Sequence, residues 1–388
     1  MSSHCNTSDS PACLIASVSG RSLAQAANRA GWRPSVIDLF ADLDTQEVSD
    51  QTFAADWDNG GFAVTSLKEG ATKLDPYGVM PVVYGGGFEC APNRLHDLCG
   101  SRELIGNRPE LVTSLQSPLE FAALLIKLNI PHPETKLAPP EGSDSAKKWL
   151  SKRIGGSGGG HVRFVNGDAK KNETHYYQKF IPGRSMSAMV LSNGKQVQVA
   201  GYSEQWRDKT IPSKPFQYGG AVSVSRNSIS HTVRESIERA ASEIVNVTGL
   251  CGLNTFDLIV NSNDWWLLEI NPRPGFTFEL HEQNFSGDEY SLFEWHIKTA
   301  SGEIPDYIEN QNKSRKAHAV IYASSKIHIP SNWLWPQWVT DIPEAESIIG
   351  RGSPVCTVHA ENQSLDEAKD QALKRHDSIN NTLQDWVL

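Results

Sequence analysis

The residues with the clearest chemistry lie within 256–275, where two apolar stretches flank a turn near Asn263. Glu269 and Asn271 are two positions apart on a predicted strand, so they share one face. If the turn is centred on Asn263, Asp257 lies opposite Glu269, with Cβ atoms ~4.5–5.5 Å apart. Two buried carboxylates this close would repel each other, and a hard divalent cation between them would remove that cost. With Asn271 as a neutral oxygen ligand, the set predicts Mg²⁺ rather than zinc or copper.

Arg273 follows this set and offers a planar, bidentate donor to a phosphate or an acyl phosphate. A purely structural alternative stays open, in which Glu269 pairs with Arg273 and Asp257 caps a turn.

A glycine-rich segment forms a second group. Lys152 ends a predicted strand and supplies a point charge, and the residues after it can turn backbone N–H groups toward phosphate oxygens. The segment consists of Gly155, Gly156, Ser157, Gly158, Gly159 and Gly160. A flexible linker is the alternative, although predicted strands on both sides argue against it.

A third group lies where an apolar strand ends at Pro182-Gly183. Backbone groups freed there could bind the edge of an adenine, but a plain strand-to-turn transition is the more probable interpretation when the segment is taken alone. The residues concerned are Gln178, Lys179, Phe180, Ile181 and Ser185.

The surrounding pattern predicts the elements that position these groups. Strands alternate with helices over the first hundred residues, which indicates a parallel sheet. Apolar spacing predicts one helix over 110–130 with Leu119 and Ile126 on its buried stripe, and another over 232–248. Asn193-Gly194 predicts a hairpin, and Ser364 begins a C-terminal helix.

The composition excludes several classes of protein. The 388 residues carry a net charge of −9, which argues against a protein that coats nucleic acid or an anionic membrane. No apolar run reaches the ~18 residues of a membrane span, and the N-terminus is a poor signal peptide. The six cysteines are scattered without a C-x-x-C pair, so we expect reduced thiols in a cytoplasmic protein.

In order and spacing, the three groups resemble the ATP-grasp superfamily. The resemblance covers about 100–300 and is most specific at Glu269-Ile270-Asn271-Pro272-Arg273-Pro274-Gly275. It implies a mixed α/β and α+β fold, with a Rossmann-like parallel-sheet domain, a two-lobed ATP clamp and a small C-terminal α/β extension. The implied domains are 1–104, 105–185, 186–310 and 311–388, the second and third being the small and large lobes.

The resemblance also implies roles for the residues. Lys152 and the 155–160 loop would hold the nucleotide phosphates, and the 178–181 strand end with Ser185 would hold adenine and ribose. Asp257, Glu269 and Asn271 would hold magnesium, two ions with Mn²⁺ as a substitute, and Arg273 would steady the transferred phosphoryl group.

The sequence departs from the family pattern at three places. Gln178 and Ser185 stand where acids are common, and an expected lysine near 110–120 is absent. Either its role is lost, or Arg102, Arg108 or Lys127 takes it.

The expected activity is a carboxylate–amine ligase that forms an amide through an acyl phosphate and releases ADP. The substrates are small molecules, with neither nucleic acid nor membrane as a partner, and a homodimer is expected. A fainter resemblance, through 19–24, 38–45 and the Trp/Pro-rich tail, is to bacterial ATP-grasp carboligases associated with methanopterin-type one-carbon metabolism. The alternatives are a carboxylase acting through carboxyphosphate and a nucleotide-binding protein without turnover.

Secondary candidates lie outside these groups. Arg21 and the 85–89 loop follow N-terminal strands, where ligands often bind. Residues 204–207 are expected to form a substrate loop, and Arg226, Glu279, His281 and Glu282 are candidates to face the acceptor.

Overall fold

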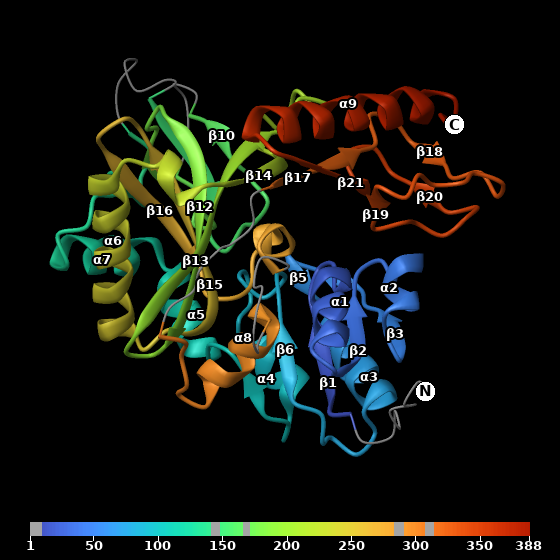
Figure 1. The fold of residues 1–388 in the computed structure, drawn as a ribbon, viewed down its shortest axis with the longest axis horizontal. Coiled ribbons are helices and arrows are strands. Elements are labelled where there is room, and N and C mark those ends of the chain that lie inside the picture. Colours follow the sequence, from blue (N-terminus) through green and yellow to red (C-terminus); the bar gives the residue numbers. More distant parts are fainter. Residues whose placement is uncertain (1–9, 141–147, 166–170, 283–290, 307–313) are drawn as a thin grey trace.

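The computed structural model describes residues 10–140, 148–165, 171–282, 291–306 and 314–388. Figure 1 shows an N-terminal part in blue, a helical and antiparallel part in teal and green, and C-terminal elements in red. The long antiparallel sheet connects the green strands with the red ones.

The N-terminal part contains a five-stranded sheet in the order β3-β2-β1-β6-β7, and every pairing in it is parallel. This confirms the parallel sheet expected from the alternating pattern. Gly31, which follows the first helix, has a φ of +78°, a conformation that suits glycine at a helix C-terminus. The elements are β1 (Ala12–Ala16), α1 (Arg21–Arg29), β2 (Arg33–Asp38), α2 (Leu43–Glu47), β3 (Gln51–Ala54), β4 (Trp57–Asp58), β5 (Gly61–Phe62), α3 (Val64–Leu74), β6 (Val82–Tyr84), α4 (Arg94–Cys99) and β7 (Leu104–Ile105).

Two helices, not one, occupy 110–130. The chain ends α5 (Pro109–Gln116) and begins α6 (Pro118–Lys127) because a proline within a helix removes a backbone donor, whereas at the first helical position it is tolerated. The break rotates the apolar stripe, so Leu119 and Ile126 are exposed while Phe121 and Leu125 are buried. The predicted single helix was therefore wrong.

A four-stranded sheet in the order β10-β9-β11-β8 follows these helices along the chain. It carries Lys152 on one strand and Gln178 on its neighbour. Its strands are β8 (Thr135–Lys136), β9 (Trp149–Arg153), β10 (Arg163–Phe164) and β11 (His175–Lys179).

An eight-stranded antiparallel sheet, ordered β16-β15-β12-β13-β14-β17-β21-β19, forms the largest part. Its strands are β12 (Arg184–Asn193), β13 (Val197–Arg207), β14 (Tyr218–Val224), β15 (Cys251–Val260), β16 (Trp265–Asn271), β17 (Arg315–Tyr322), β19 (Val339–Thr340) and β21 (Pro354–Asn362). A separate pair is β18 (Ile327–His328) with β20 (Ile348–Ile349). The helices are α7 (His231–Thr248), α8 (Leu292–Ala300) and α9 (Leu365–Gln384), with 3₁₀ turns η2 (Arg226–Ser228) and η3 (Phe276–Leu280).

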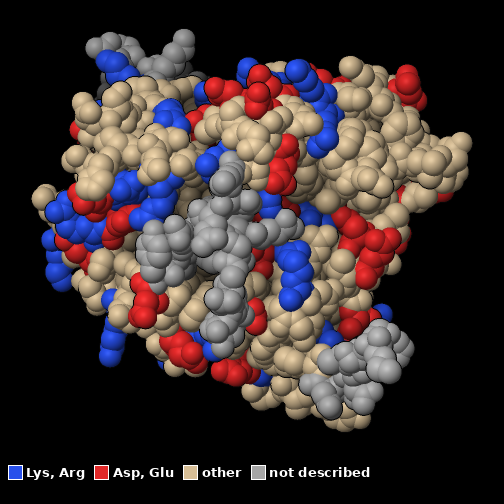
Figure 2. Space-filling model, in the orientation of Figure 1, with Lys and Arg blue, Asp and Glu red and all other residues tan. Residues whose placement is uncertain are grey.

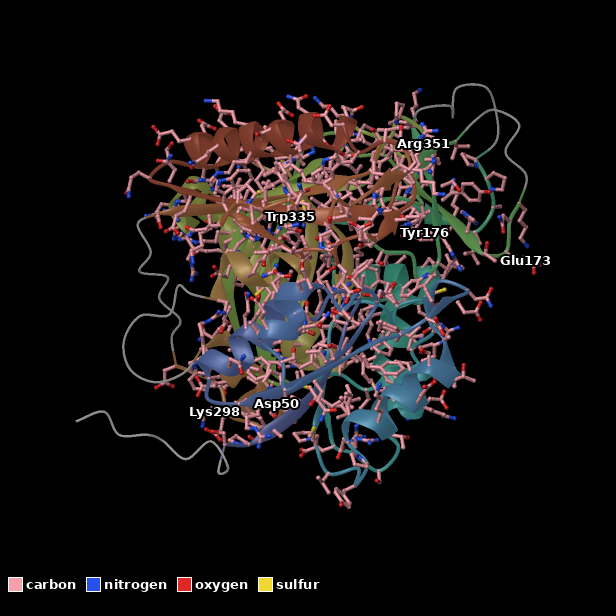
Figure 3. The ribbon with its side chains drawn as sticks, turned by 90° about the vertical axis from the view of Figure 1, so that its right-hand side faces the viewer. Asp50, Glu173, Tyr176, Lys298, Trp335 and Arg351 are labelled. Atoms are coloured by element: carbon pink, nitrogen blue, oxygen red, sulfur yellow. The ribbon has the colours of Figure 1, made fainter. Side chains whose placement is uncertain are left out.

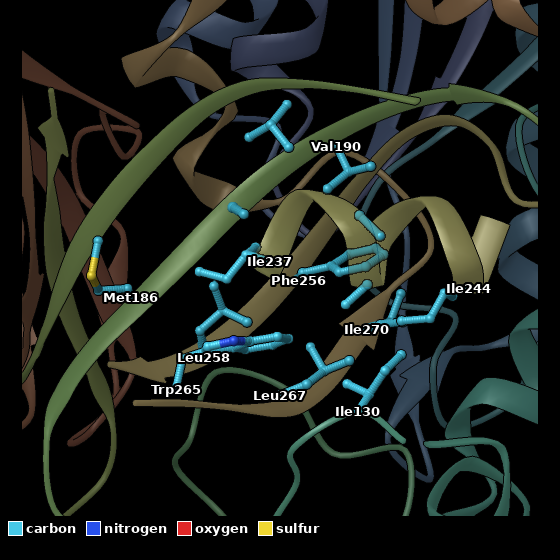
Figure 4. Close-up of a cluster of buried hydrophobic side chains, with 14 of the residues drawn as sticks. Ile130, Met186, Val190, Ile237, Ile244, Phe256, Leu258, Trp265, Leu267 and Ile270 are labelled. Atoms are coloured by element: carbon cyan, nitrogen blue, oxygen red, sulfur yellow. The ribbon is translucent and has the colours of Figure 1, made fainter. Parts of the chain in front are cut away.

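The alternation of strand residues assigns the two faces of this sheet. Phe256, Leu258 and Ile270 pack with Ile237 of α7 in one core, which Figure 4 shows. Met189, on the other face, packs with residues of α8 and of the N-terminal sheet in a second core. Asp257 lies between Phe256 and Leu258, so it belongs to the face that α7 does not cover.

The C-terminal elements prolong the long sheet. β17 pairs with β14, β21 pairs with β17, and α9 packs on them, its N-cap Ser364 accepting from the Glu367 N–H. The division of the chain at 104, 185 and 310 stays a prediction. None of the described helices combines the length and apolar character that crossing a membrane needs.

Candidate active site

A cavity of about 1070 Å³ collects the predicted residues from all parts of the chain. Of the sixteen residues predicted to hold the nucleotide, the metal or the phosphoryl group, all line this cavity except Gly155 and Gly160. Gly155 instead packs on the N-terminal part, where an added Cβ would lie 2.5 Å from the Cys90 Cα.

Asp257 and Glu269 are directly opposed on β15 and β16, as the sequence predicts, but through a different turn. The loop is four residues long, since Val260 pairs with Trp265. A bulge between Asp257 and Leu258 then shifts the register by one residue and brings the two acids opposite each other. The predicted pairing is correct, and the predicted three-residue turn is wrong.

The Asp257 carboxylate is held by two amides. It accepts from Gln205 Nε2 at 3.1 Å and from Asn271 Nδ2 at 2.9 Å. Burial, followed by the charge of Glu269, raises the pKa of Asp257 to about 7. A cation between the acids would relieve this repulsion, so the donor set fits a hard divalent ion. Asn271 would have to turn its amide over to offer its oxygen.

No group of three or more His, Cys, Asp or Glu side chains in the described parts of the chain could hold a metal. The predicted set has two carboxylates and one amide, and is therefore a smaller site that relies on the oxygens of a ligand for the rest of its coordination.

Lys152 lines the same cavity as the acid pair and is buried. Burial acts to lower the pKa of Lys152, but Tyr176, Glu269 and Asp257 together raise it above its ordinary value. The ammonium lies 6.0 Å from the centroid of the Tyr176 ring, labelled in Figure 3. These acids of β15 and β16 therefore favour the charged form of Lys152 on β9.

The glycine-rich loop packs against the chain that enters β14. The Gly158 carbonyl accepts from the Tyr218 N–H at 2.9 Å, and a Cβ on Gly159 would lie 2.0 Å from the Phe216 carbonyl oxygen. Gly158 and Gly159 both have positive φ, near +70°, which glycine adopts readily. This packing is unlike that of a free linker.

The strand end after Gln178 is more fully bonded than expected. The Lys179 N–H donates to Glu134 O and the Phe180 N–H donates to Lys148 O, each at 2.8 Å. These two N–H groups are therefore not free to bind the edge of an adenine, contrary to what the sequence had led us to expect for this strand end. The Phe180 ring lies 5.3 Å from Phe164 and 6.3 Å from Phe216, so aromatic rings border the cavity here.

Arg273 is held by the N-terminal part of the molecule. Its guanidinium forms an ion pair with Glu89, which is 5% exposed and also accepts from the Gly87 N–H at 2.9 Å. Arg273 also donates to Asn271 Oδ1 at 3.3 Å. The structural alternative of a Glu269–Arg273 pair is thus not what the structure has. The 85–89 loop acts here through Glu89, which no motif had singled out.

Several secondary candidates are corrected. Arg102 forms an ion pair with Asp75. Neither Arg102 nor the other two candidates for the missing lysine, Arg108 and Lys127, line the cavity. Residues 204–207 are the end of strand β13 rather than a loop.

The expected acceptor-facing residues also lie apart. Arg226 pairs with Glu238, and His281 is buried against Ser203. Glu279 pairs with Arg21, and Glu282 is 3% exposed; neither lines the cavity. Gln205 was expected only as part of a 204–207 loop, and no motif pointed to His161, which lines the cavity beside Gly156.

Comparisons with known proteins agree with this geometry. Residues 118–277 match the model of the ATP-grasp domain family. The biotin carboxylase of Campylobacter jejuni, solved as a complex with β-γ-ATP, superimposes with a TM-score of 0.70 at 14% identity, covering 92% of this chain and 89% of that one. This likeness confirms the predicted fold.

Two proteins of Methanocaldococcus jannaschii match in sequence. One, uncharacterized, is 23% identical over 277 residues, 67% of this chain. The other, a tyramine–L-glutamate ligase, is 30% identical over 158 residues, 40% of this chain. The chain spans 64% and 44% of the length of these two relatives.

Proposed function

Because the chain is a member of the ATP-grasp superfamily, we propose that it is an ATP- and Mg²⁺-dependent carboxylate–amine ligase. The observation that carries the proposal is the meeting of Lys152 with the Asp257–Glu269 pair in one cavity. This arrangement suits a triphosphate, whose negative oxygens would lie between a fixed ammonium and cations held by the acids.

Each group has a role in the proposed reaction. Gln178, Lys179, Phe180, Ile181 and Ser185 would hold the nucleoside, and Lys152 with the N–H groups of 155–160 would neutralise phosphate charge. Asp257, Glu269 and Asn271 would hold Mg²⁺, which when bound polarises phosphate oxygens and neutralises developing charge. Arg273, oriented by Glu89, would bind the transferred phosphoryl group.

The chemistry has two displacements. A carboxylate oxygen forms a bond to the γ-phosphorus while the bond to the ADP oxygen breaks. The amine nitrogen then bonds the acyl carbon while phosphate leaves, and a proton is lost from nitrogen. The protein contributes alignment and exclusion of water, because an acyl phosphate exposed to water would hydrolyse.

The substrate class is proposed from two supports. The sequence relative is named for joining tyramine to L-glutamate, and the fainter resemblance described above points to one-carbon cofactor synthesis. We therefore expect glutamate and aromatic or pterin-like amines to be the first compounds worth offering.

The test is ADP release measured over a panel of carboxylates and amines, each alone and in pairs. A pair that gives release well above either compound alone supports the ligase, and the amide product identifies it. Release that needs bicarbonate instead would support the carboxylase alternative, which the biotin carboxylase likeness favours at the level of fold. Tight nucleotide binding with no release for any pair would contradict both enzymes.

A further inference from the structure

Part of the cavity is not used by the proposed nucleotide site. It lies where α2 and the loop after β2 meet the segment that follows β19, and its lining includes Phe40, Asp42, Asp341, Glu344 and Ile348. Figure 2 shows acidic side chains gathered on the surface where α2 approaches β19.

The buried cation of this region, Arg21, is fully engaged. It is 2% exposed and donates to Asp341 at 2.9 Å and to Glu279 at 2.7 Å, with Asp44 at 3.6 Å. His318 adds a contact to Glu279 at 2.9 Å. Arg21 therefore has no free edge for an anionic ligand.

The acids around Arg21 are satisfied, with one exception. Asp38 accepts from the N–H groups of Gly20, Phe40 and Ala41. Asp44 accepts from those of 341 and 342. Asp42 is 7% exposed and lines the cavity, but its carboxylate has no hydrogen bond or ion pair to any described residue.

The charges near Asp42 do not balance. Asp38, Asp44 and Asp341 raise the pKa of Asp42, after burial itself, and Arg21 opposes them only in part. Burial lowers the pKa of nearby His359 to about 4, so His359 adds no positive charge at neutral pH. A cationic ligand would supply the missing charge, because an unpaired buried carboxylate is costly.

The cavity wall indicates what kind of cation fits. The described residues contain no group of three or more acidic, histidine or cysteine side chains able to hold a metal, and the oxygens of Asp38 and Asp44 are already occupied by backbone donors. Large apolar side chains of the lining are left exposed, Phe40 and Phe276 by 39% and Ile348 by 58%. An ammonium group on an apolar or aromatic body matches both features.

We propose that Asp42 binds the ammonium group of the amine substrate, whose apolar body lies along Phe40 and Ile348. That this amine is a substrate rests on the proposed function, whereas the binding of an organic ammonium at Asp42 does not. The cavity would then hold two partners, the nucleotide at Lys152 and the amine at Asp42.

The test is calorimetric titration without nucleotide at about pH 8, where Asp42 is partly ionised. The probes are 2-phenylethylamine, its neutral isostere 2-phenylethanol and the anion 3-phenylpropionate. We expect the amine to bind at least about tenfold more tightly than the other two, and Asp42→Asn to remove that preference while leaving the alcohol unaffected.

Asp50→Asn is the matched control. Asp50 lies in the same N-terminal part, directly before β3, in an ion pair with Arg33, and Figure 3 shows it on the side far from the C-terminal elements. The Asp50→Asn variant should leave the titrations with all three probes unchanged. Asp42→Ser serves if the Asn variant does not fold, which melting curves report.

Equal binding of the three probes, no binding of the amine, or full preference in both Asp42 variants would each overturn the proposal. The titration measures binding without turnover, so the amine subsite and the ligase hypothesis can fail independently of each other. Amine binding without ADP release for any pair would remove the ligase and keep the subsite. Ligase activity with an unaltered amine KM in Asp42→Asn would do the reverse.

Discussion

Two groups of acids among the described residues differ in what faces them. Asp257 and Glu269 line the same cavity as Lys152, and Arg273 lies beside them. The acids around Arg21 outnumber that one arginine, and the Asp42 carboxylate has no hydrogen bond or ion pair within the described part of the chain. Burial penalises both groups. The first group faces a lysine, and a divalent cation would relieve the repulsion between its two acids, so it suits a ligand that brings phosphates. The second contains Asp42, which has no hydrogen bond or ion pair to the described residues, so it suits a ligand that is itself a cation.

The largest effect should come from removing one acid of the first group. Glu269→Gln should reduce ADP release by at least about 100-fold, because one carboxylate is too few to hold the divalent ion that phosphoryl transfer needs. Steady-state kinetics with a productive substrate pair measure this. Glu235→Gln, on the exposed surface of α7, is the control and should keep wild-type rates. Full activity of Glu269→Gln would remove the metal assignment.

The next effect concerns the anchor of Arg273. Glu89→Gln should lower kcat by about 10- to 100-fold, because Arg273 loses the charged partner that orients it. It should also lower the melting temperature by several degrees, since a buried arginine is left with a neutral neighbour. Glu89→Asp should restore part of kcat. A melting change with no kinetic change would make Glu89 purely structural.

A smaller effect should follow from the glycine loop. Gly159→Ala should raise the KM for ATP by about tenfold, because its Cβ would meet the Phe216 carbonyl in addition to adopting a strained φ. Gly158→Ala has the same positive φ but open space around it, so a few-fold rise is expected. Equal KM values for the two variants would argue that the packing on Phe216 does not matter.

The smallest effect concerns the second acid group and is a change of the protein's stability with pH. The pKa of Asp42 is about 8 in the fold against 3.8 as its ordinary value, so the native state holds a proton that the unfolded chain releases between these values. Stability should therefore fall as pH rises through this window, by on the order of 2–4 kcal/mol in the limit.

Asp42→Asn lacks this titration and should melt several degrees higher than the wild type at pH near 8, with the difference shrinking toward pH near 5. Melting temperatures across this range measure it. A constant difference would mean that Asp42 is ionised throughout, or that its carboxylate has a partner in solution.

The sequence predicted the site better than the surroundings of the site. Asp257 and Glu269 could be placed opposite each other because strand alternation and a short turn constrain register strongly. The compensating bulge, which leaves Leu268 of β16 without a partner on β15, could not be foreseen from the turn alone. Pro118 is a signal for a helix break, but the prediction of one helix over 110–130 followed the apolar spacing instead.

Long-range partners were beyond the reach of the sequence. Glu89 lies far from Arg273 along the chain, and Asp42 meets Asp341 only because α2 approaches the C-terminal elements. No local periodicity encodes such meetings. The cavity at the junction therefore appears only when the three parts of the chain are assembled.

The pairing of β17 with β14 has a consequence for any shortened version of the chain. Ending the polypeptide near residue 310 would strip a neighbour from β14 and leave its backbone donors and acceptors at 220–222 as an open sheet margin. Such margins recruit strands from other molecules. The last fifth of the chain thus covers this margin of the long sheet, and a fragment cut at this point should self-associate and precipitate.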